Sequence, residues 1–168
     1  MTNRDTMRSA LQQHTVPLLI CRGFTGKYPH FRRAREGCIE LLSFQTNKWG
    51  GSFTVEVSAA FPKAEDTNYS LYGSMTEKTL NVSATNQRYR LPGMFDGWFY
   101  YTDVYRKRTL LFGSVYHNVS ERDAGSFVPP KGYRLVQRFD AETAARICEE
   151  VNRQLDRAFA WLTSFCGR

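Results

Sequence analysis

The stretch FQTNKWGGSFTVEVSAAF, residues 44–61, decides the fold because it contains the clearest strand pattern in the chain. Apolar side chains recur at every second position of its second half: Phe53, Val55, Val57, Ala59 and Phe61. A period of two sorts side chains onto the two faces of a strand, so this pattern predicts a sheet with one buried face. Pro62 ends the strand because proline cannot donate a hydrogen bond to a neighbouring strand.

Two further strands are predicted just before this one. FRRARE (31–36) and CIELLSF (38–44) are extended, and Glu36-Gly37 forms the turn between them. Gly50 and Gly51 allow a tight turn before residues 53–61. The three segments therefore predict an antiparallel meander.

Both ends of the chain predict helices. Residues 2–21 are helical, and Pro17 either ends one helix or begins a second, short one. The C-terminal helix has Asp140 as its N-cap and Glu142 in its first turn. Its apolar stripe has a spacing of three and four: Ala144, Ile147, Val151, Leu155, Ala158, Leu162 and Phe165. Such a stripe is typical of a helix that covers a sheet.

The middle of the chain is less regular. QRYRL (87–91), WFYYTDVY (98–105) and YRLVQRF (133–139) are predicted strands, whereas residues 109–117 fit either a hairpin partner or a helix. KAEDTNYSLYGS (63–74) is predicted to be a polar loop, and residues 75–86 fit no single element. We expect one α+β domain over residues 1–168, built on a single antiparallel sheet of about five to seven strands with the N- and C-terminal helices on one face.

Charge and cysteine content limit the classes of function. The net charge of +7 is compatible with an acidic partner, although composition alone favours a solubility role. Four cysteines, at positions 21, 38, 148 and 166, have no CxxC spacing, and the N-terminus lacks the apolar region of a signal peptide. We therefore expect a cytoplasmic protein with reduced, mostly buried thiols and no membrane span.

Several short motifs resemble the bacterial family catalogued as domain of unknown function 4304. They are CRGF after the first helix, the basic strand HFRRARE, and LLSFQTNKWGGSFTVEV. The positions that match the family pattern are Gly23, Phe24, Phe31, Arg32, Gln45, Lys48 and Phe53, with Arg88, Arg90 and Trp98 later in the chain. The resemblance covers the first sixty or so residues best and the last thirty moderately. Residues 104–130 depart from the pattern as an insertion would. The resemblance implies a fold and a bacterial cytosolic setting, without an activity.

Motifs for catalysis, metal binding or cofactor binding are missing from the sequence. GFTGKY lacks the spacing and the Ser or Thr of a phosphate-binding loop, and the three histidines have no metal-ligand spacing. We therefore expect no metal and no cofactor, and we name no catalytic residue. Glu40 and Glu56 lie on neighbouring predicted strands, where they could face each other as an acid–base pair or bind arginines.

Basic and aromatic residues alternate in HFRRAR, QRYRL and YRKR. A sheet face with both types can bind a nucleic-acid backbone and stack bases. The electrostatic contacts would be Arg32, Arg88, Arg90, Lys107 and Arg108. Because neighbouring residues on a strand point to opposite faces, the commoner arrangement places aromatics inward and arginines outward on a solvated face.

Trp49, beside Lys48 in the hairpin turn, is either a lid over the open end of the sheet or an anchor for a ligand. As an anchor it would line a concave face with Gln45 and Arg32 or Arg90 on its floor. The candidate binding residues are Arg32, Gln45, Lys48, Trp49, Arg88, Arg90 and Trp98.

Three functions stay open at this point. The first is a non-enzymatic binding domain for an acidic protein or a small anionic ligand, and the balance of the motifs favours it over an enzyme. The second is a nucleic-acid-binding protein that uses the basic-aromatic sheet face. The third is an enzyme with a dispersed site.

Overall fold

The computed structural model describes residues 2–61, 80–85, 87–110, 113–120, 123 and 126–166. Its elements in chain order are α1 (Asn3–His14), α2 (Val16–Cys21), β1 (Thr25–Lys27), β2 (His30–Arg35), β3 (Cys38–Thr46), β4 (Ser52–Ala60), the short 3-10 helix η2 (Val82–Ala84), β5 (Arg88–Arg90), β6 (Phe99–Tyr100), β7 (Val104–Thr109), β8 (Gly113–Asn118), β9 (Arg134–Gln137) and α3 (Ala141–Cys166). The predicted loop at residues 63–74 and most of residues 75–86 lie outside the described residues. No helix in the described part of the chain is both long and apolar enough to cross a membrane.

The main sheet is antiparallel, with the strand order β1-β2-β3-β4-β5 and with β6 paired to β4. Strands β2, β3 and β4 form the predicted meander, joined by the turn at Glu36-Gly37 and by a turn at residues 47–51. Gly37, Gly50 and Gly51 all have φ values of 70–78°, which glycine adopts without steric cost. The α+β class with an antiparallel main sheet is confirmed.

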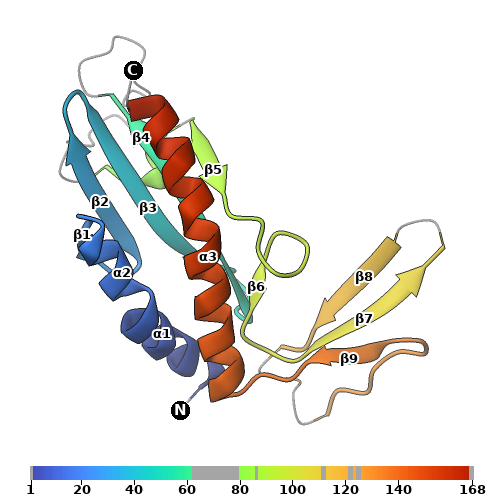
Figure 1. Ribbon diagram of the computed structural model, residues 1–168. Coiled ribbons are helices and arrows are strands. Elements are labelled where there is room, and N and C mark those ends of the chain that lie inside the picture. The colour runs from blue at the N-terminus through green and yellow to red at the C-terminus, as the bar shows by residue number, and fades with distance from the viewer. Residues whose placement is uncertain are drawn as a thin grey trace.

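Both terminal helices lie on the same face of the main sheet, as predicted (Figure 1). The long helix α3 runs diagonally across β3, β4 and β5, with α1 beside it. Helix α3 begins after Asp140, whose carboxylate accepts a hydrogen bond from the Thr143 amide at 2.8 Å. That bond and the Thr143 hydroxyl hold the pKa of Asp140 below its usual value, which agrees with the predicted N-cap.

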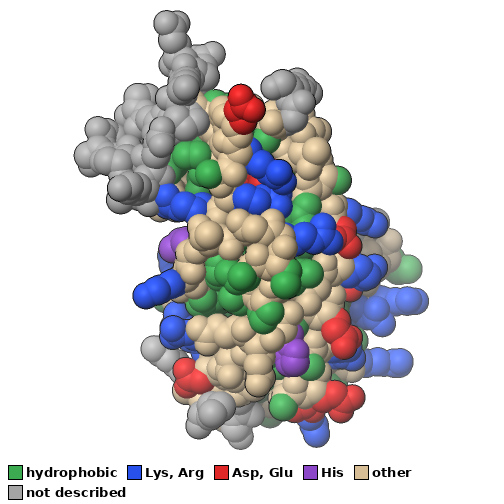
Figure 2. All heavy atoms as spheres, turned by 60° about the vertical axis from the view of Figure 1, so that its left-hand side comes forward, with side chains coloured by type: hydrophobic (Ala, Val, Ile, Leu, Met, Phe, Trp, Pro, Cys, Tyr) green, Lys and Arg blue, Asp and Glu red, His purple; other side chains and the backbone are tan. Residues whose placement is uncertain are grey.

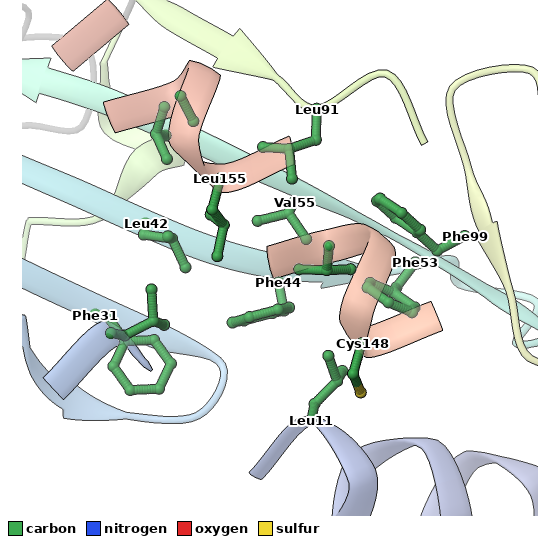
Figure 3. Packing of buried hydrophobic residues seen from close by; sticks show 14 of the residues in the cluster. Leu11, Phe31, Leu42, Phe44, Phe53, Val55, Leu91, Phe99, Cys148 and Leu155 are labelled. Carbon is green, nitrogen blue, oxygen red and sulfur yellow. The ribbon is translucent and has the colours of Figure 1, made fainter. Parts of the chain in front are cut away.

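The core lies between the helices and this face of the sheet (Figure 3). Leu11 of α1 and Cys148 and Leu155 of α3 meet Phe44 and Phe53 of the sheet there. These residues are buried, and the aromatic rings of Phe44 and Phe53 lie 6.3 Å apart. The apolar half of the β4 alternation thus builds the core, which is why residues 44–61 fix the fold.

The other side of β4, which we call the far face of the main sheet, is also buried. The expectation of a single buried face is therefore wrong for β4, because all nine of its residues are buried. On the far face, Ile39, Leu41 and Ala60 form a small apolar cluster with Leu80, Val82 and Ala84. The chain returns over this face at residues 80–85, and a sequence period alone cannot reveal that cover.

Strands β7, β8 and β9 form a second antiparallel sheet in the order β8-β7-β9. This sheet projects from the main body as an arm (Figure 1). Of the segment 109–117, for which a hairpin partner or a helix was expected, residues 113–117 belong to the hairpin partner β8, and the basic residues 106–108 belong to strand β7 itself. The predicted strand at residues 98–105 is divided, because β6 joins the main sheet and β7 joins the second one. Gln137 fixes the root of the arm by donating to the Tyr100 and Thr102 carbonyls at 2.7 and 3.0 Å.

A disulfide joins Cys38, at the start of β3, to Cys166, at the end of α3. The expectation of reduced thiols is therefore wrong for Cys38 and Cys166. Helix α3 places its last residue, Cys166, over the start of β3, and the Cα atoms of the two cysteines lie 5.6 Å apart, within the range of a disulfide. The other two cysteines, Cys148 and Cys21, are free thiols; Cys148 is buried and Cys21 is exposed. Burial raises the pKa of Cys148 to about 11 and makes this thiol unreactive at neutral pH.

Candidate functional site

Three of the predicted binding residues converge on Glu56 at the far face of the main sheet. The Glu56 carboxylate accepts a hydrogen bond from Arg90 Nε at 2.8 Å and lies 2.7 Å from Arg90 Nη2. Gln45 Nε2 donates to its other oxygen at 2.8 Å, and Arg88 Nη1 lies 3.8 Å from that oxygen. Strand register explains the cluster, because Glu56 is opposite Arg90 and lies two residues from Ser58, which is opposite Arg88 on the same face. The cluster offsets part of the arginine charge internally.

Arg32 lies on the same face, two strands away. The row across the sheet is Arg32, Leu41, Ser58 and Arg88. Arg32 Nη2 donates to the Leu80 carbonyl at 2.9 Å. Arg32 therefore holds the covering segment at residues 80–85 against the sheet.

Lys48 and Trp49 lie at the tip of the hairpin turn. The Trp49 side chain is 81% exposed, so the interpretation of Trp49 as a lid over the core is wrong. Lys48 Nζ lies 4.7 Å from the centre of the Trp49 ring. Lys48 and Trp49 are not among the residues that contact the Glu56 carboxylate, so the predicted residues form two groups.

Trp98 extends the Glu56 cluster towards the second sheet. The Arg90 guanidinium lies 5.9 Å from the centre of the Trp98 ring. Trp98 pairs with Phe95 through reciprocal backbone hydrogen bonds of 2.8 and 3.1 Å, which close a tight turn. The Phe95 ring in turn lies 5.0 Å from the ring of Tyr116 on β8. A line of contacts therefore connects the far face of the main sheet to the arm.

Beyond Tyr116, one face of the second sheet is basic. Tyr116 is opposite Arg106 on β7, and Arg106 is opposite Arg134 on β9. Arg108 shares this face because it is two residues from Arg106 on the same strand. We call Arg106, Arg108, Arg134 and Tyr116 the arginine face. Arg108 and Arg134 are exposed and Arg106 is half-buried.

The arginine face differs from the Glu56 cluster, where Arg88 and Arg90 lie beside a carboxylate, in its lack of counter-charges among the described residues. On the side of the molecule in Figure 2, Lys and Arg side chains are scattered among hydrophobic and acidic ones. Within the described part of the chain, none of the three arginines of the arginine face forms an ion pair. The sequence prediction named Arg108 but missed Arg106 and Arg134. The spacing of two between Arg106 and Arg108 is the signal that could have identified a basic face.

The opposite face of the second sheet is aromatic. His117 stacks on Phe127 with ring centres 4.9 Å apart, and Phe127 lies 5.3 Å from Tyr105. Lys107, predicted as a contact together with Arg108, points to this opposite side, where its Nζ lies 6.0 Å from the Tyr133 ring. Lys107 and Arg108 therefore cannot contact the same ligand surface.

The paired carboxylates considered in the sequence do not face each other. Glu40 is opposite Ala59 and Glu56 is opposite Ser43, and this register places the two carboxylates on opposite faces of the sheet. The acid–base pair is therefore wrong. The alternative of arginine partners is correct for both, although both carboxylates are buried and do not lie on a solvated face. Among the described residues, no three His, Cys, Asp or Glu side chains gather in a manner that would hold a metal ion.

Replacing Gly93 with alanine should disrupt the turn that carries Phe95 and Trp98. Gly93 has a φ of 73°, and an added Cβ would lie 2.5 Å from the Trp98 amide nitrogen. We expect a loss of about 1–3 kcal/mol in the free energy of unfolding and a changed tryptophan emission spectrum. Urea titration followed by fluorescence measures both.

The matched control is Gly97→Ala, four residues later in the same turn. Gly97 has a similar φ of 80°, but no atom lies within 4 Å of its added Cβ. Only the backbone strain of about 1 kcal/mol should remain there. Equal losses in the two variants would contradict the steric explanation for Gly93.

Comparison with known proteins adds one finding. A family model described as Domain of unknown function (DUF4304) matches residues 15–163, including the arm. No curated protein and no solved structure matches the chain.

Proposed function

We propose, from the premise that the chain belongs to the family described as Domain of unknown function (DUF4304), that it is a non-enzymatic binding domain for an acidic protein surface. The family description assigns no activity, so the proposal rests on the surface chemistry of the chain. We extend it to a bacterial, cytoplasmic setting, which is the setting implied by the sequence resemblance.

The arginine face is the observation that carries the proposal. Residues 104–138 contain seven Lys and Arg against two Asp and Glu, and this segment therefore holds +5 of the net charge of +7. Guanidinium groups without an internal counter-charge are available to carboxylates of a partner. The planar fork of arginine matches a carboxylate with two parallel hydrogen bonds, which favours an acidic protein as the ligand.

Trp49 gives this surface an apolar anchor. The turn at residues 47–51 reaches the root of the arm, where a Cβ added to Gly51 would lie 3.1 Å from Asn118 Nδ2. An exposed tryptophan beside a basic surface is typical of the residues that dominate binding energy in protein interfaces. Lys48, close to the Trp49 ring, adds a further positive charge there.

Nucleic acid is the second candidate, because aromatic rings lie beside the arginines. Tyr116 belongs to the arginine face and Phe95 packs against it. A base would need an accessible ring for stacking, whereas both rings are half-buried against each other. This burial ranks nucleic acid below an acidic protein.

The remaining alternatives have weaker support. Glu56 already binds Arg88 and Arg90, so these arginines are less available to a small anionic ligand at the far face. For an enzyme, both carboxylates considered in the sequence are occupied by arginines. We therefore assign structural roles to Gln45, Arg88 and Arg90.

The test removes the charge of the arginine face. Arg106→Gln/Arg108→Gln/Arg134→Gln should weaken binding of a fluorescein-labelled Asp- and Glu-rich peptide at least about tenfold, since three charge contacts are lost. Fluorescence anisotropy across a salt series measures the affinity, which should fall as salt rises. Trp49→Ala should weaken binding further if the peptide carries an aromatic or aliphatic residue.

The control removes the same number of charges elsewhere. Lys27, Arg146 and Arg157 are exposed and lie outside the arginine face. Their triple replacement with glutamine should leave the affinity within about twofold. If both triple variants lost the same affinity for the acidic peptide, binding would depend only on net charge, and the proposal would be overturned. Tighter, arginine-dependent binding of single-stranded oligonucleotides with the same number of charges would favour the nucleic-acid candidate instead.

A further inference from the structure

A cavity of about 390 Å³ lies between α1 and the end of the main sheet near the hairpin turn. Its volume is in the range of small-molecule sites, which span about 300–1,000 Å³. Helix α1, the segment before β2, and strands β3 and β4 all contribute to its wall. The lining residues on which the inference depends are Asp5, Met7, Arg8, Leu11, Tyr28 and Phe53.

The floor of the cavity is apolar and belongs to the packed core. Met7 and Leu11 of α1 and Phe53 of β4 are all buried. The Phe53 ring stacks on Phe99 with a distance of 5.1 Å between the ring centres. Side chains held in this way cannot rearrange freely, so the floor is formed before any ligand arrives.

The wall of the cavity includes the Arg8 guanidinium. It lies 5.7 Å from the centre of the Tyr28 ring, and it forms no ion pair among the residues that the structure describes. Burial raises the pKa of Tyr28, so the phenol stays protonated at neutral pH and can donate a hydrogen bond. Arg4 and Thr46 also line the opening.

Among the described residues that line the cavity, Asp5 is the only acidic one, and it already accepts hydrogen bonds. Asp5 accepts hydrogen bonds from the Thr2 amide at 3.1 Å and from the Thr2 hydroxyl at 2.8 Å, in the capping box of α1. No ion pair joins Asp5 to Arg8 among the described residues. The Arg8 guanidinium can therefore pair with a single anionic group on a ligand.

We propose that this cavity binds a small organic anion that has one carboxylate on an apolar body. Arg8 and Tyr28 contact the carboxylate, and the apolar body lies over Met7, Leu11 and Phe53. The site is on the helix-covered side of the sheet and uses no residue of the arginine face. The inference therefore does not depend on the proposed function.

The experiment is isothermal titration of the full chain with 3-phenylpropionate and with its neutral amide. The acid should bind with a stoichiometry near one, and the amide should bind at least about tenfold more weakly because it cannot pair with Arg8. Arg8→Gln should reduce the affinity for the acid by a similar factor, and Tyr28→Phe by a smaller one. Amide chemical shifts in the labelled protein should change at Met7, Leu11 and Phe53.

The control variant is Arg157→Gln, which removes one exposed charge from α3 and should leave the affinity unchanged. Thermal unfolding of each variant without ligand separates loss of binding from loss of fold. The proposal is overturned by equal affinity for acid and amide, by an unchanged affinity in Arg8→Gln, or by no binding of 3-phenylpropionate at about 1 mM.

Discussion

Replacing Arg33 with methionine should lower the free energy of unfolding by about 3–5 kcal/mol, because it leaves a buried carboxylate without its main partner. Glu40 is 1% exposed at its side chain, and the Arg33 side chain is 13% exposed. The two residues are opposite each other on β2 and β3, on the face of the sheet that the helices cover. Urea unfolding followed by circular dichroism measures the loss.

Arg33 is fixed by more than its ion pair. Its guanidinium lies 4.6 Å from the centre of the Phe24 ring and 5.8 Å from that of Phe159. Its Nη1 also donates to the Arg22 carbonyl at 2.6 Å. Methionine retains the length of the apolar stem, so the variant reports mainly on the lost charge and hydrogen bonds.

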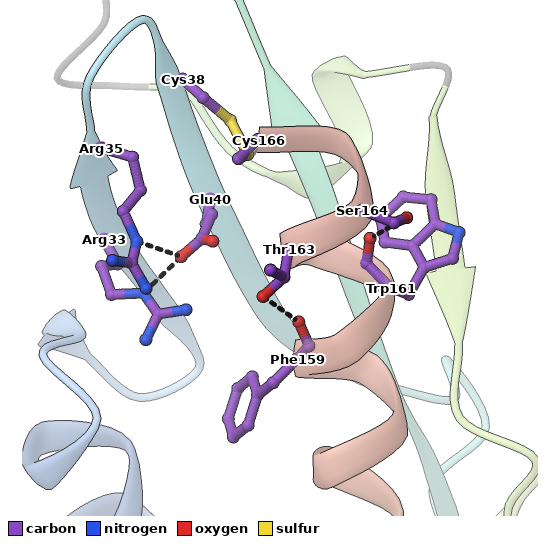
Figure 4. The surroundings of a disulfide bond; sticks show 9 residues. All are labelled: Arg33, Arg35, Cys38, Glu40, Phe159, Trp161, Thr163, Ser164 and Cys166. Atoms are coloured by element: carbon purple, nitrogen blue, oxygen red, sulfur yellow. Dashed lines mark hydrogen bonds and ion pairs between the residues drawn. A yellow bond between two sulfur atoms is a disulfide. The ribbon is translucent and has the colours of Figure 1, made fainter. Parts of the chain in front are cut away.

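Arg35 provides the matched control, since it approaches the same carboxylate from a more exposed position. Arg35 Nε lies 3.7 Å from Glu40 Oε2, and its side chain is 50% exposed. Figure 4 shows Arg33 and Arg35 both pointing towards Glu40. Because solvent screens the outer pair, Arg35→Met should cost at most about 1 kcal/mol.

The double variant Arg33→Met/Glu40→Leu separates the pair from its surroundings. Arg33→Met leaves the buried Glu40 carboxylate without its main partner, whereas the double variant removes that carboxylate as well. The double variant should therefore be more stable than Arg33→Met alone. A loss equal to the sum of the two single variants would contradict a coupled buried pair. In that case the contribution of Arg33 would come from its packing against Phe24 and Phe159.

The second large effect concerns the disulfide. Cys166→Ser should lower the free energy of unfolding by about 2–4 kcal/mol under oxidising conditions. The bond closes a loop with a sequence separation of 128 residues, and it therefore restricts the unfolded chain strongly. Urea unfolding of the oxidised protein with and without the substitution measures the difference.

Two controls accompany this prediction. Dithiothreitol should remove the difference between Cys166→Ser and the parent chain, and Cys21→Ser should have little effect because Cys21 is an exposed free thiol. Thiol titration gives an independent answer: one thiol should react in the native protein and two after unfolding without reductant. Four reactive thiols in the unfolded chain would show that the disulfide is absent.

The sequence could predict those parts of the fold that depend on local periodicity. The alternation in residues 53–61 determined β4, and Glu36-Gly37 determined the β2–β3 turn. The apolar stripe and Asp140 determined α3 and its beginning. These features follow from spacing along the chain, because side-chain direction repeats every 2 residues in a strand and every 3.6 in a helix.

The sequence could predict which residues are candidates for binding, but it could not predict which of them contact one another. Gln45, Arg88 and Arg90 meet at Glu56, and Trp98 lies beside Arg90. The Glu56 carboxylate also offsets the charge of the arginines, which makes them less available to a ligand. Trp49, in contrast, lies apart from them and is exposed. A residue list taken from a sequence pattern contains no information on which charges cancel.

By itself, the sequence determined the helix and strand periods, the turns and the excess of positive charge. Tertiary structure alone decided that strands β7, β8 and β9 form a second sheet, that Arg106, Arg108 and Arg134 share one face, and that Cys38 meets Cys166. The physical reason is that these features depend on strand register and on contacts between distant segments. A shift of one residue in register would move every side chain to the opposite face without changing any local pattern.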